Sequence, residues 1–292
     1  MVQYTPEYLI RRLVTANIGD PLMHEDRSDG LRSVQLALDV LETLAFSSEE
    51  LGVTQLAQRL KLTKGSVHRH LLTLVERGYL VQNPMTTRYA LGPRSRLLAH
   101  HAPDADLIQL AAGPMRELRD QLGHSVVLSE STPRGALVLS MVPGTSAIEI
   151  GVRSGSELPF HSSAQGKVLL AFAPRPQQQR VLAKPLPSFT SHTVVDPKPL
   201  ELELLRVAQL GFATAPEQAM LGINAIAAPI FDDRDCCAGA LALVGSIQFL
   251  PAEPDMNSVS ALKAAAGQIS RMLGHGRVGN LSEAQSARQR TA

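Results

Sequence analysis

The spacing of apolar residues between residues 31 and 91 constrains the fold of this chain more than any other feature. Three segments have apolar side chains at helical spacing: residues 31–46, 53–60 and 64–77. Thr54 and Thr63 are suitable N-caps for the second and third of these helices, and Gly78 is a suitable C-cap for the third. Two short alternating runs, 79–82 and 88–91, then predict a β-hairpin. This order of three helices and a hairpin predicts a winged helix–turn–helix.

Basic charge is concentrated in the same part of the chain. The whole chain has 28 Lys and Arg against 27 Asp and Glu, a formal net charge of +1, which by itself argues against nucleic-acid binding. Residues 59–96, however, contain eight Lys and Arg and one Glu, a local net charge of +7, whereas residues 28–58 carry −4. Such a segment is either an ordinary solvated surface or a surface for double-stranded DNA. The predicted winged helix–turn–helix favours DNA.

The polar face of the 64–77 helix supplies the candidate DNA contacts. At about 100° per residue, this face lies opposite the apolar stripe of the helix. We expect Lys64 and Arg69 to reach phosphates or guanine edges, and Arg88, at the hairpin tip, to reach a phosphate or the minor groove. His70 and Leu72 are expected to pack inside the domain. The complete predicted DNA-binding set is Lys64, Ser66, His68, Arg69, Thr73 and Arg88.

A second domain of strands and helices follows a helix predicted over residues 104–122. Strands are predicted at these segments: 125–130, 136–142, 147–153, 212–215, 223–232 and 237–246. Residues 154–161 are predicted to be a loop. Helices are predicted at 162–173, 176–183, 198–211 and 255–273. This pattern predicts an α+β fold with a curved, mostly antiparallel sheet.

The chain is accordingly divided into five parts. They are an N-terminal extension (1–27), the winged helix–turn–helix domain (28–92), a linker helix (93–103), the α+β domain (104–275) and a disordered tail (276–292).

Cysteine usage and hydropathy indicate a cytoplasmic protein. The two cysteines, Cys236 and Cys237, are adjacent, which disfavours a disulfide between them; whether they sense redox is left open. The sequence contains no run of about 18 apolar residues, the length that a membrane-spanning helix needs. The first residues also lack the apolar core of a signal peptide. No Cys/His cluster has metal-ligand spacing, so neither a metal nor another cofactor is expected.

Five motifs, in this order and spacing, together resemble the IclR family of bacterial transcriptional regulators over residues 31–275. The motifs are LRSVQLALDVLETLA, LTKGSVHRHLLTLVERGYL, RYALGPR, LPFHSSAQGKVLLA and LGINAIAAPIFDDRDCCAGALALVGS. The resemblance implies that the second domain is a GAF/PAS-like effector-binding domain. It also implies dimers, often assembled into tetramers, that bind a palindromic operator and more often repress than activate. Small organic acids or aromatic catabolites are the effectors that the family implies.

The start of the 162–173 helix is the candidate anion site. Free backbone amides at a helix start favour a carboxylate, here on Ala164 and Gln165 with a hydroxyl from Ser162 or Ser163, although the two serines could also only cap the helix. The resemblance adds sheet residues to this pocket. The complete predicted effector-binding set is Ala147, Ile150, Phe160, Ser162, Ser163, Ala164, Gln165, Ala215, Ile223, Ala225, Ala242 and Val244.

The predicted pocket is more apolar than that of several family members. Positions 215, 242 and 244 carry polar or acidic side chains in those members, whereas this chain has Ala215, Ala242 and Val244. Apolar walls leave buried polar groups of a ligand unpaired, so an effector with an apolar or aromatic body and one acidic end is favoured over a two-carbon acid.

An enzyme is the competing hypothesis. His161 and Ser162 are adjacent and could serve a small-molecule hydrolase, with the winged helix as an interaction module. Adjacent residues at a helix start seldom form such a pair, and no GxSxG elbow is present. No catalytic residue is therefore assigned, and we expect an effector-responsive transcriptional regulator.

Overall fold

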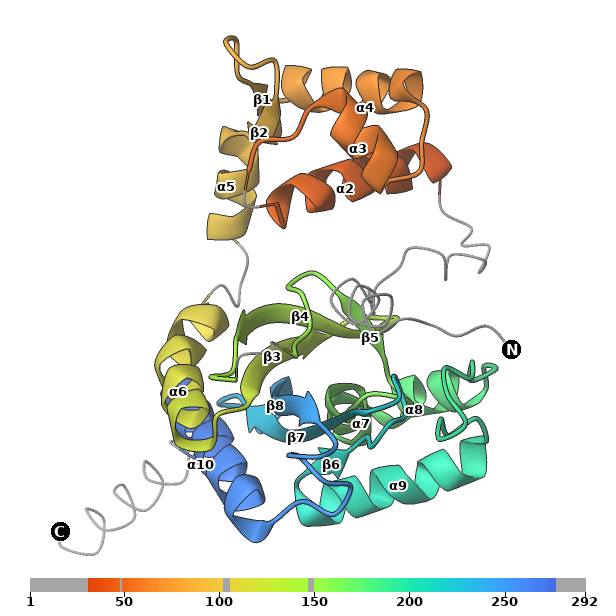
Figure 1. Cartoon of the computed structure of the whole chain (residues 1–292), viewed down its shortest axis with the longest axis vertical. Helices are drawn as coiled ribbons and strands as arrows, with labels where there is room; N and C mark the ends of the chain where they lie inside the picture. Colours follow the sequence, from red (N-terminus) through yellow and green to blue (C-terminus); the bar gives the residue numbers. More distant parts are fainter. Residues whose placement is uncertain (1–30, 48, 102–105, 147–149, 277–292) are drawn as a thin grey trace, which may run out of the picture. The chain divides into compact units, whose positions relative to one another are not determined.

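The computed structural model describes residues 31–47, 49–101, 106–146 and 150–276. These residues form two compact units, with the boundary between residues 105 and 106 (Figure 1). The predicted extension, the end of the linker segment and residues 277–292 of the tail lie outside the described residues. In the part of the chain that the structure describes, no helix combines the length and apolar character needed to cross a membrane.

The first unit is a winged helix–turn–helix, as predicted. Its elements are α2 (Arg32–Ala45), α3 (Val53–Arg59), α4 (Lys64–Glu76), β1 (Leu80–Gln82), β2 (Tyr89–Leu91) and α5 (Pro93–His100). The two strands pair antiparallel, with Val81 opposite Ala90. One core, which includes Val40, Leu56 and Leu71, joins α2, α3 and α4. Tyr89 buries the hairpin against the same core.

The ends of the helices confirm two of the three predicted caps. Thr63 Oγ1 accepts a hydrogen bond from the amide of Ser66 at 3.2 Å, so Thr63 is the N-cap of α4. Gly78, with φ +75°, follows α4 in the left-handed region. The prediction for Thr54 was wrong, because α3 already begins at Val53. The N-cap is Gly52, whose amide donates to Gln55 Oε1 at 3.0 Å.

The second unit confirms the predicted α+β class with a curved antiparallel sheet (Figure 1). Six strands lie in the order β5-β4-β3-β8-β7-β6. They are β3 (Ser125–Ser131), β4 (Gly135–Val142), β5 (Glu157–Pro159), β6 (Ala213–Thr214), β7 (Ile223–Phe231) and β8 (Cys237–Ser246). The helices are α6 (Asp106–Leu122), α7 (Ala164–Ala171), α8 (Arg175–Leu182), α9 (Pro197–Leu210) and α10 (Met256–Met272).

The helices cover both faces of this sheet. One hydrophobic core joins α6 and α10 to one face, and a second core joins α7 and α9 to the other. The face under α7 is lined by small side chains, because Ala227 pairs with Ala242, and Ser129 pairs with Ala240. Small side chains let a helix approach a sheet closely, and every residue of α7 from Ala164 to Leu170 is buried.

One predicted strand was wrong and one observed strand was missed. Residues 147–149 lie outside the described residues, and Ile150–Arg153 is not a strand. The carbonyl of Ile150 accepts a hydrogen bond from the Ser125 hydroxyl instead of joining a strand ladder. On the side of β4 away from β3, the partner strand is β5, in the segment predicted as a loop, with Leu158 opposite Ala136.

Candidate functional site

Helix α4 presents a polar face to solvent in the first unit. Lys64, His68, Arg69 and Thr73 are exposed and Ser66 is half-buried. The Thr73 hydroxyl donates to the carbonyl of Arg69 at 3.2 Å. The structure therefore brings together the five helix residues of the predicted DNA-binding set on one helix, and their contact with DNA stays a prediction.

Leu72 contradicts the expectation that it packs inside the domain. Its side chain is 56% exposed. At about 100° per residue, Leu72 points in nearly the same direction as Gly65 and Glu76, the middle of the exposed face. An apolar residue type alone predicted burial, whereas the helical angle would have predicted exposure. An exposed aliphatic group on this face is suited to contact the methyl group of thymine.

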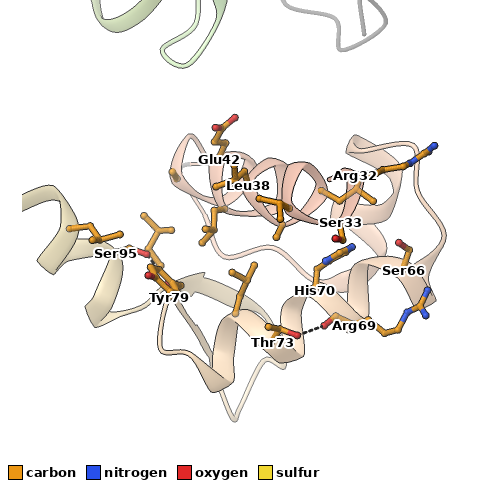
Figure 2. A pocket seen from close by; sticks show the side chains of 18 of the residues that line it. Arg32, Ser33, Leu38, Glu42, Ser66, Arg69, His70, Thr73, Tyr79 and Ser95 are labelled. Atoms are coloured by element: carbon orange, nitrogen blue, oxygen red, sulfur yellow. Dashed lines mark hydrogen bonds between the residues drawn. The ribbon is translucent and has the colours of Figure 1, made fainter. Parts of the chain in front are cut away.

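A groove of about 1100 Å³ runs along one edge of this face. Figure 2 shows the side chains of Ser66, Arg69 and Thr73 of α4 on one side of the groove and those of α2 on the other. The apolar part of its lining includes Val34 and Leu38. These two side chains are half-exposed. Phe46 at the end of α2 and Leu98 of α5 line the same groove, and both, like the neighbouring Leu97, are more than half-exposed. This exposed set is called the α2/α5 apolar face: Val34, Leu38, Phe46, Leu97 and Leu98.

Arg88 does not lie at the tip of the hairpin. It directly precedes β2, its side chain is exposed, and its Nη1 donates to the carbonyl of Glu50 at 3.4 Å. The tip consists of Pro84, Met85 and Thr86. The prediction of the position of Arg88 was wrong because the second strand begins at Tyr89, which leaves six residues, 83–88, between the two strands. Its role as a phosphate contact stays a prediction.

The start of α7 is buried and contains polar atoms without partners. Ser163 is the N-cap: its Oγ accepts from the amide of Gly166 at 3.0 Å and donates to the carbonyl of Pro159 at 2.8 Å. Ser162 and Gln165 are 0% and 1% exposed. Among the described residues, nothing forms a hydrogen bond with Ser162 Oγ or Gln165 Nε2. Unpartnered buried groups of this kind are uncommon in folded proteins and are expected at ligand sites.

The remaining predicted effector-binding residues join the same core, with one exception. Ala147 lies outside the described residues. Ile150 packs against this core from a loop and not, as predicted, from a strand. The others that belong to or pack against the core are Phe160, Ala164, Ala215, Ile223, Ala225, Ala242 and Val244. Except for Ala147, the structure thus gathers the predicted set around α7.

A buried ion pair beside this site was not predicted. Lys167 is 2% exposed, its Nζ lies 2.7 Å from Glu203 Oε2 of α9, and it donates to the carbonyl of Thr214 at 3.2 Å. Burial lowers the pKa of Lys167, and the carboxylate of Glu203 raises it again. The signal in the sequence was a lysine inside the apolar run of α7, with acidic residues on the amphipathic α9.

His161 is not paired with Ser162. Its Nε2 lies 2.8 Å from the carbonyl of Pro187, and its ring packs on Phe189 with a centroid distance of 5.8 Å. Burial lowers the pKa of His161 more than the carbonyl of Pro187 raises it. A ring nitrogen held by a backbone carbonyl does not activate a neighbouring hydroxyl.

Among the described residues, the cysteines and the possible metal ligands are not gathered into a further cluster. Cys236 is exposed and Cys237 is half-buried, and both thiols are free. Burial raises the pKa of Cys237 to about 12, which disfavours its reactive thiolate form. Searching the described ranges finds no group of three or more His, Cys, Asp and Glu side chains placed to hold a metal ion.

Two family descriptions match the chain. Residues 99–271 match "Bacterial transcriptional regulator IclR C-terminal", and residues 33–84 match "IclR helix-turn-helix domain". The Glycerol operon regulatory protein of Streptomyces coelicolor is 32% identical over 252 residues, which are 85% of this chain and 98% of that protein. The Transcriptional repressor IclR of Escherichia coli is 26% identical over 221 residues, 74% of this chain and 81% of that protein.

A solved structure with the same architecture contains a small molecule. It is an IclR homolog of Microbacterium hydrocarbonoxydans complexed with 4-hydroxybenzoate, with a TM-score of 0.68 and 26% identity, covering 82% of this chain and 98% of that chain. The relatives are named as transcriptional regulators and not as enzymes. The hydrolase hypothesis for His161 and Ser162 is therefore set aside.

Proposed function

Because the chain belongs to the IclR family of bacterial transcriptional regulators, we propose that it is an effector-responsive repressor that binds a palindromic operator as a dimer. The observation that carries the proposal is the exposed face of α4, where Lys64, His68 and Arg69 project from a helix whose opposite side is buried. The DNA contacts that we propose are the residues predicted from the sequence: Lys64, Ser66, His68, Arg69, Thr73 and Arg88. The repressor of Escherichia coli supports the sign of regulation. We place the activity in the cytoplasm, where the DNA is found.

The α2/α5 apolar face supports the dimer. It places five exposed apolar side chains on one unit, and contiguous exposed apolar surface marks a protein interface. A second copy is the occupant we propose, because a twofold dimer presents two α4 helices to the two halves of a palindrome. The effector units could assemble such dimers further into a tetramer.

We propose that the effector is a small organic acid with an apolar or aromatic body, held at the start of α7. The first amides of a helix favour a carboxylate, and Ser162 Oγ and Gln165 Nε2 are unpartnered hydrogen-bonding groups beside them. The alanine-rich sheet and Phe160 supply apolar walls. The Microbacterium homolog, which has the same architecture, is complexed with 4-hydroxybenzoate, an aromatic acid of the class that we propose.

Two measurements test the proposal. An electrophoretic shift of the DNA upstream of the gene should weaken steeply as salt increases, because phosphate contacts release counterions. Calorimetry should detect 4-hydroxybenzoate or a longer-chain acid and not glyoxylate. Tight binding of glyoxylate with no binding of aromatic acids would contradict the effector class, and the absence of any DNA binding would contradict the function itself.

A further inference from the structure

The turn of the hairpin, residues 83–87, is fixed by its own hydrogen bonds. Asn83 Oδ1 accepts from the amides of Met85 at 3.0 Å and Thr86 at 3.4 Å. The backbone of Asn83 bonds to Thr87 and Arg88, each at 2.8 Å. Thr87 has φ +56°, an uncommon conformation for a residue other than glycine. The turn is therefore held in one shape before any partner binds.

Glu50 holds the turn from outside. Its carboxylate accepts from Asn83 Nδ2 at 3.0 and 3.2 Å and from the Thr86 hydroxyl at 3.1 Å. Glu50 is itself anchored, because the next residue, Leu51, exchanges two backbone hydrogen bonds with Tyr89, at 2.9 and 3.2 Å. The turn is thus attached to the rigid part of the unit by a side chain that is distant in the sequence.

This fixed turn presents one large apolar side chain to solvent. Met85 is 90% exposed, the highest exposed fraction among the large apolar side chains of the described residues. The hydrogen bonds described above hold the backbone that carries Met85, so its side chain stays at the tip of the turn. Within this unit, the turn and α4 lie on the same side, away from α2 (Figure 1).

We propose that Met85 is an apolar wedge that enters the minor groove of the operator beside the major-groove contacts of α4. Apolar side chains of this size insert between base steps and kink the duplex. A single projecting side chain is too small for a protein interface, which buries about 800 Å² per partner. The α2/α5 apolar face is the larger surface and serves the second copy.

The wedge would let the protein recognise how easily the DNA deforms, a property that hydrogen bonds to base edges do not detect. Flexible pyrimidine–purine steps are unstacked at lower cost than stiff A-tracts, so Met85 selects for a TA or CA step under the turn. Arg88 and the positive charge of residues 59–96 hold the adjacent backbone. This inference rests on the proposed operator binding.

The test uses the full-length protein and an operator selected from a random-sequence DNA pool. Met85→Ala is compared with Met85→Leu, which keeps a wedge, and with Met256→Ala, a matched control 75% exposed in the second unit. We expect Met85→Ala to lose about tenfold in affinity, the equivalent of burying one Met side chain, and to reduce the bend measured by circular permutation. Met85→Leu and Met256→Ala should keep both.

Each other result overturns the inference in a different way. Equal affinity and equal bending for Met85→Ala and wild type would exclude the wedge. A change in oligomeric state of Met85→Ala on size-exclusion chromatography would assign Met85 to a protein interface. If wild type selects no operator from the pool, the proposed function fails first, and the wedge with it.

Discussion

The two candidate sites differ in how their polar groups are satisfied before a ligand arrives. On α4, Lys64, His68 and Arg69 are exposed and solvated, so DNA binding exchanges water for phosphates and bases. At the start of α7, Ser162 and Gln165 are buried, and Ser162 Oγ and Gln165 Nε2 lack partners. The first site does not lower the stability of the unliganded protein, because its polar groups stay in water. The second offers hydrogen-bonding groups that no protein group uses, so an effector that bonds to them should stabilise the folded protein.

Glu203→Leu should have the largest effect, because it removes the partner of a buried charge. Lys167 would remain buried without Glu203, and we expect the free energy of unfolding to fall by about 3 kcal/mol. The matched control is Arg134→Ala, which removes an exposed cation from its 2.8 Å pair with Glu157 and should cost at most about 1 kcal/mol. Urea denaturation measures both, and equal losses would contradict the distinction between buried and exposed pairs.

The loss in Glu203→Leu should depend on pH in one direction. Burial lowers the pKa of Lys167 in the folded protein below its ordinary value of 10.5. Between the lowered pKa and pH 10.5, the unfolded chain therefore binds more protons than the folded one. Stability of the variant should therefore rise with pH from the lowered pKa of Lys167 up to 10.5, as the buried amine becomes neutral in both states. A variant whose deficit relative to wild type is constant over this range would contradict the assignment to Lys167.

Arg69→Ala tests the exposed site. We expect operator affinity to fall by about tenfold, the effect of removing one phosphate or base contact, with unfolding free energy and effector binding unchanged. Arg206→Ala, an exposed arginine of α9, is the control and should bind the operator like wild type. Unchanged operator affinity of Arg69→Ala would count against the assignment of this face to the major groove.

Ser162→Ala tests the buried site and should separate stability from binding. Removing an unpartnered buried hydroxyl should leave the unliganded protein as stable as wild type or up to about 1 kcal/mol more stable. The rise in melting temperature on adding 4-hydroxybenzoate should become smaller. Ser260→Ala, at an exposed serine of α10, should change neither quantity. Lower stability of Ser162→Ala with an unchanged effector response would show that the hydroxyl is structural.

The smallest expected effects concern Glu50, because its negative charge should weaken operator binding while its hydrogen bonds to the turn should strengthen it. Glu50→Gln removes a negative charge and keeps one acceptor oxygen for the turn, so operator affinity should stay equal or rise slightly. Glu50→Ala removes the charge and all three contacts to Asn83 and Thr86, and affinity should fall by about threefold, since a looser turn must be ordered on binding. Tighter binding by both variants would show that only the charge matters.

The exposed site could be predicted from the sequence more completely than the buried one. Helical periodicity placed α4 and its polar face, because the stripe of Val67, Leu71 and Leu74 is a local signal. Leu72 was missed, since residue type was given more weight than helical angle. The prediction placed the start of α7 within two residues, since the helix begins at Ala164 with Ser163 as its N-cap.

The surroundings of the buried site required tertiary information. The Lys167–Glu203 pair joins two helices that are separated in sequence, and a lysine is ordinarily predicted to be exposed. The alternation of residues 147–153 predicted a strand, but the edge of β4 is occupied by β5, whose Leu158 is buried. Which segment joins a sheet edge depends on competition between segments that local periodicity does not describe.

The alanines under α7 imply that a single substitution by a slightly larger side chain can change which ligand fits. Because Ala225, Ala227, Ala240 and Ala242 set how closely α7 lies on the sheet, replacing one of them by serine or valine would alter the room beside the helix start while leaving the winged unit untouched. The two compact units have separate cores. Proteins with this fold can therefore evolve to respond to a new effector while they still bind the same operators.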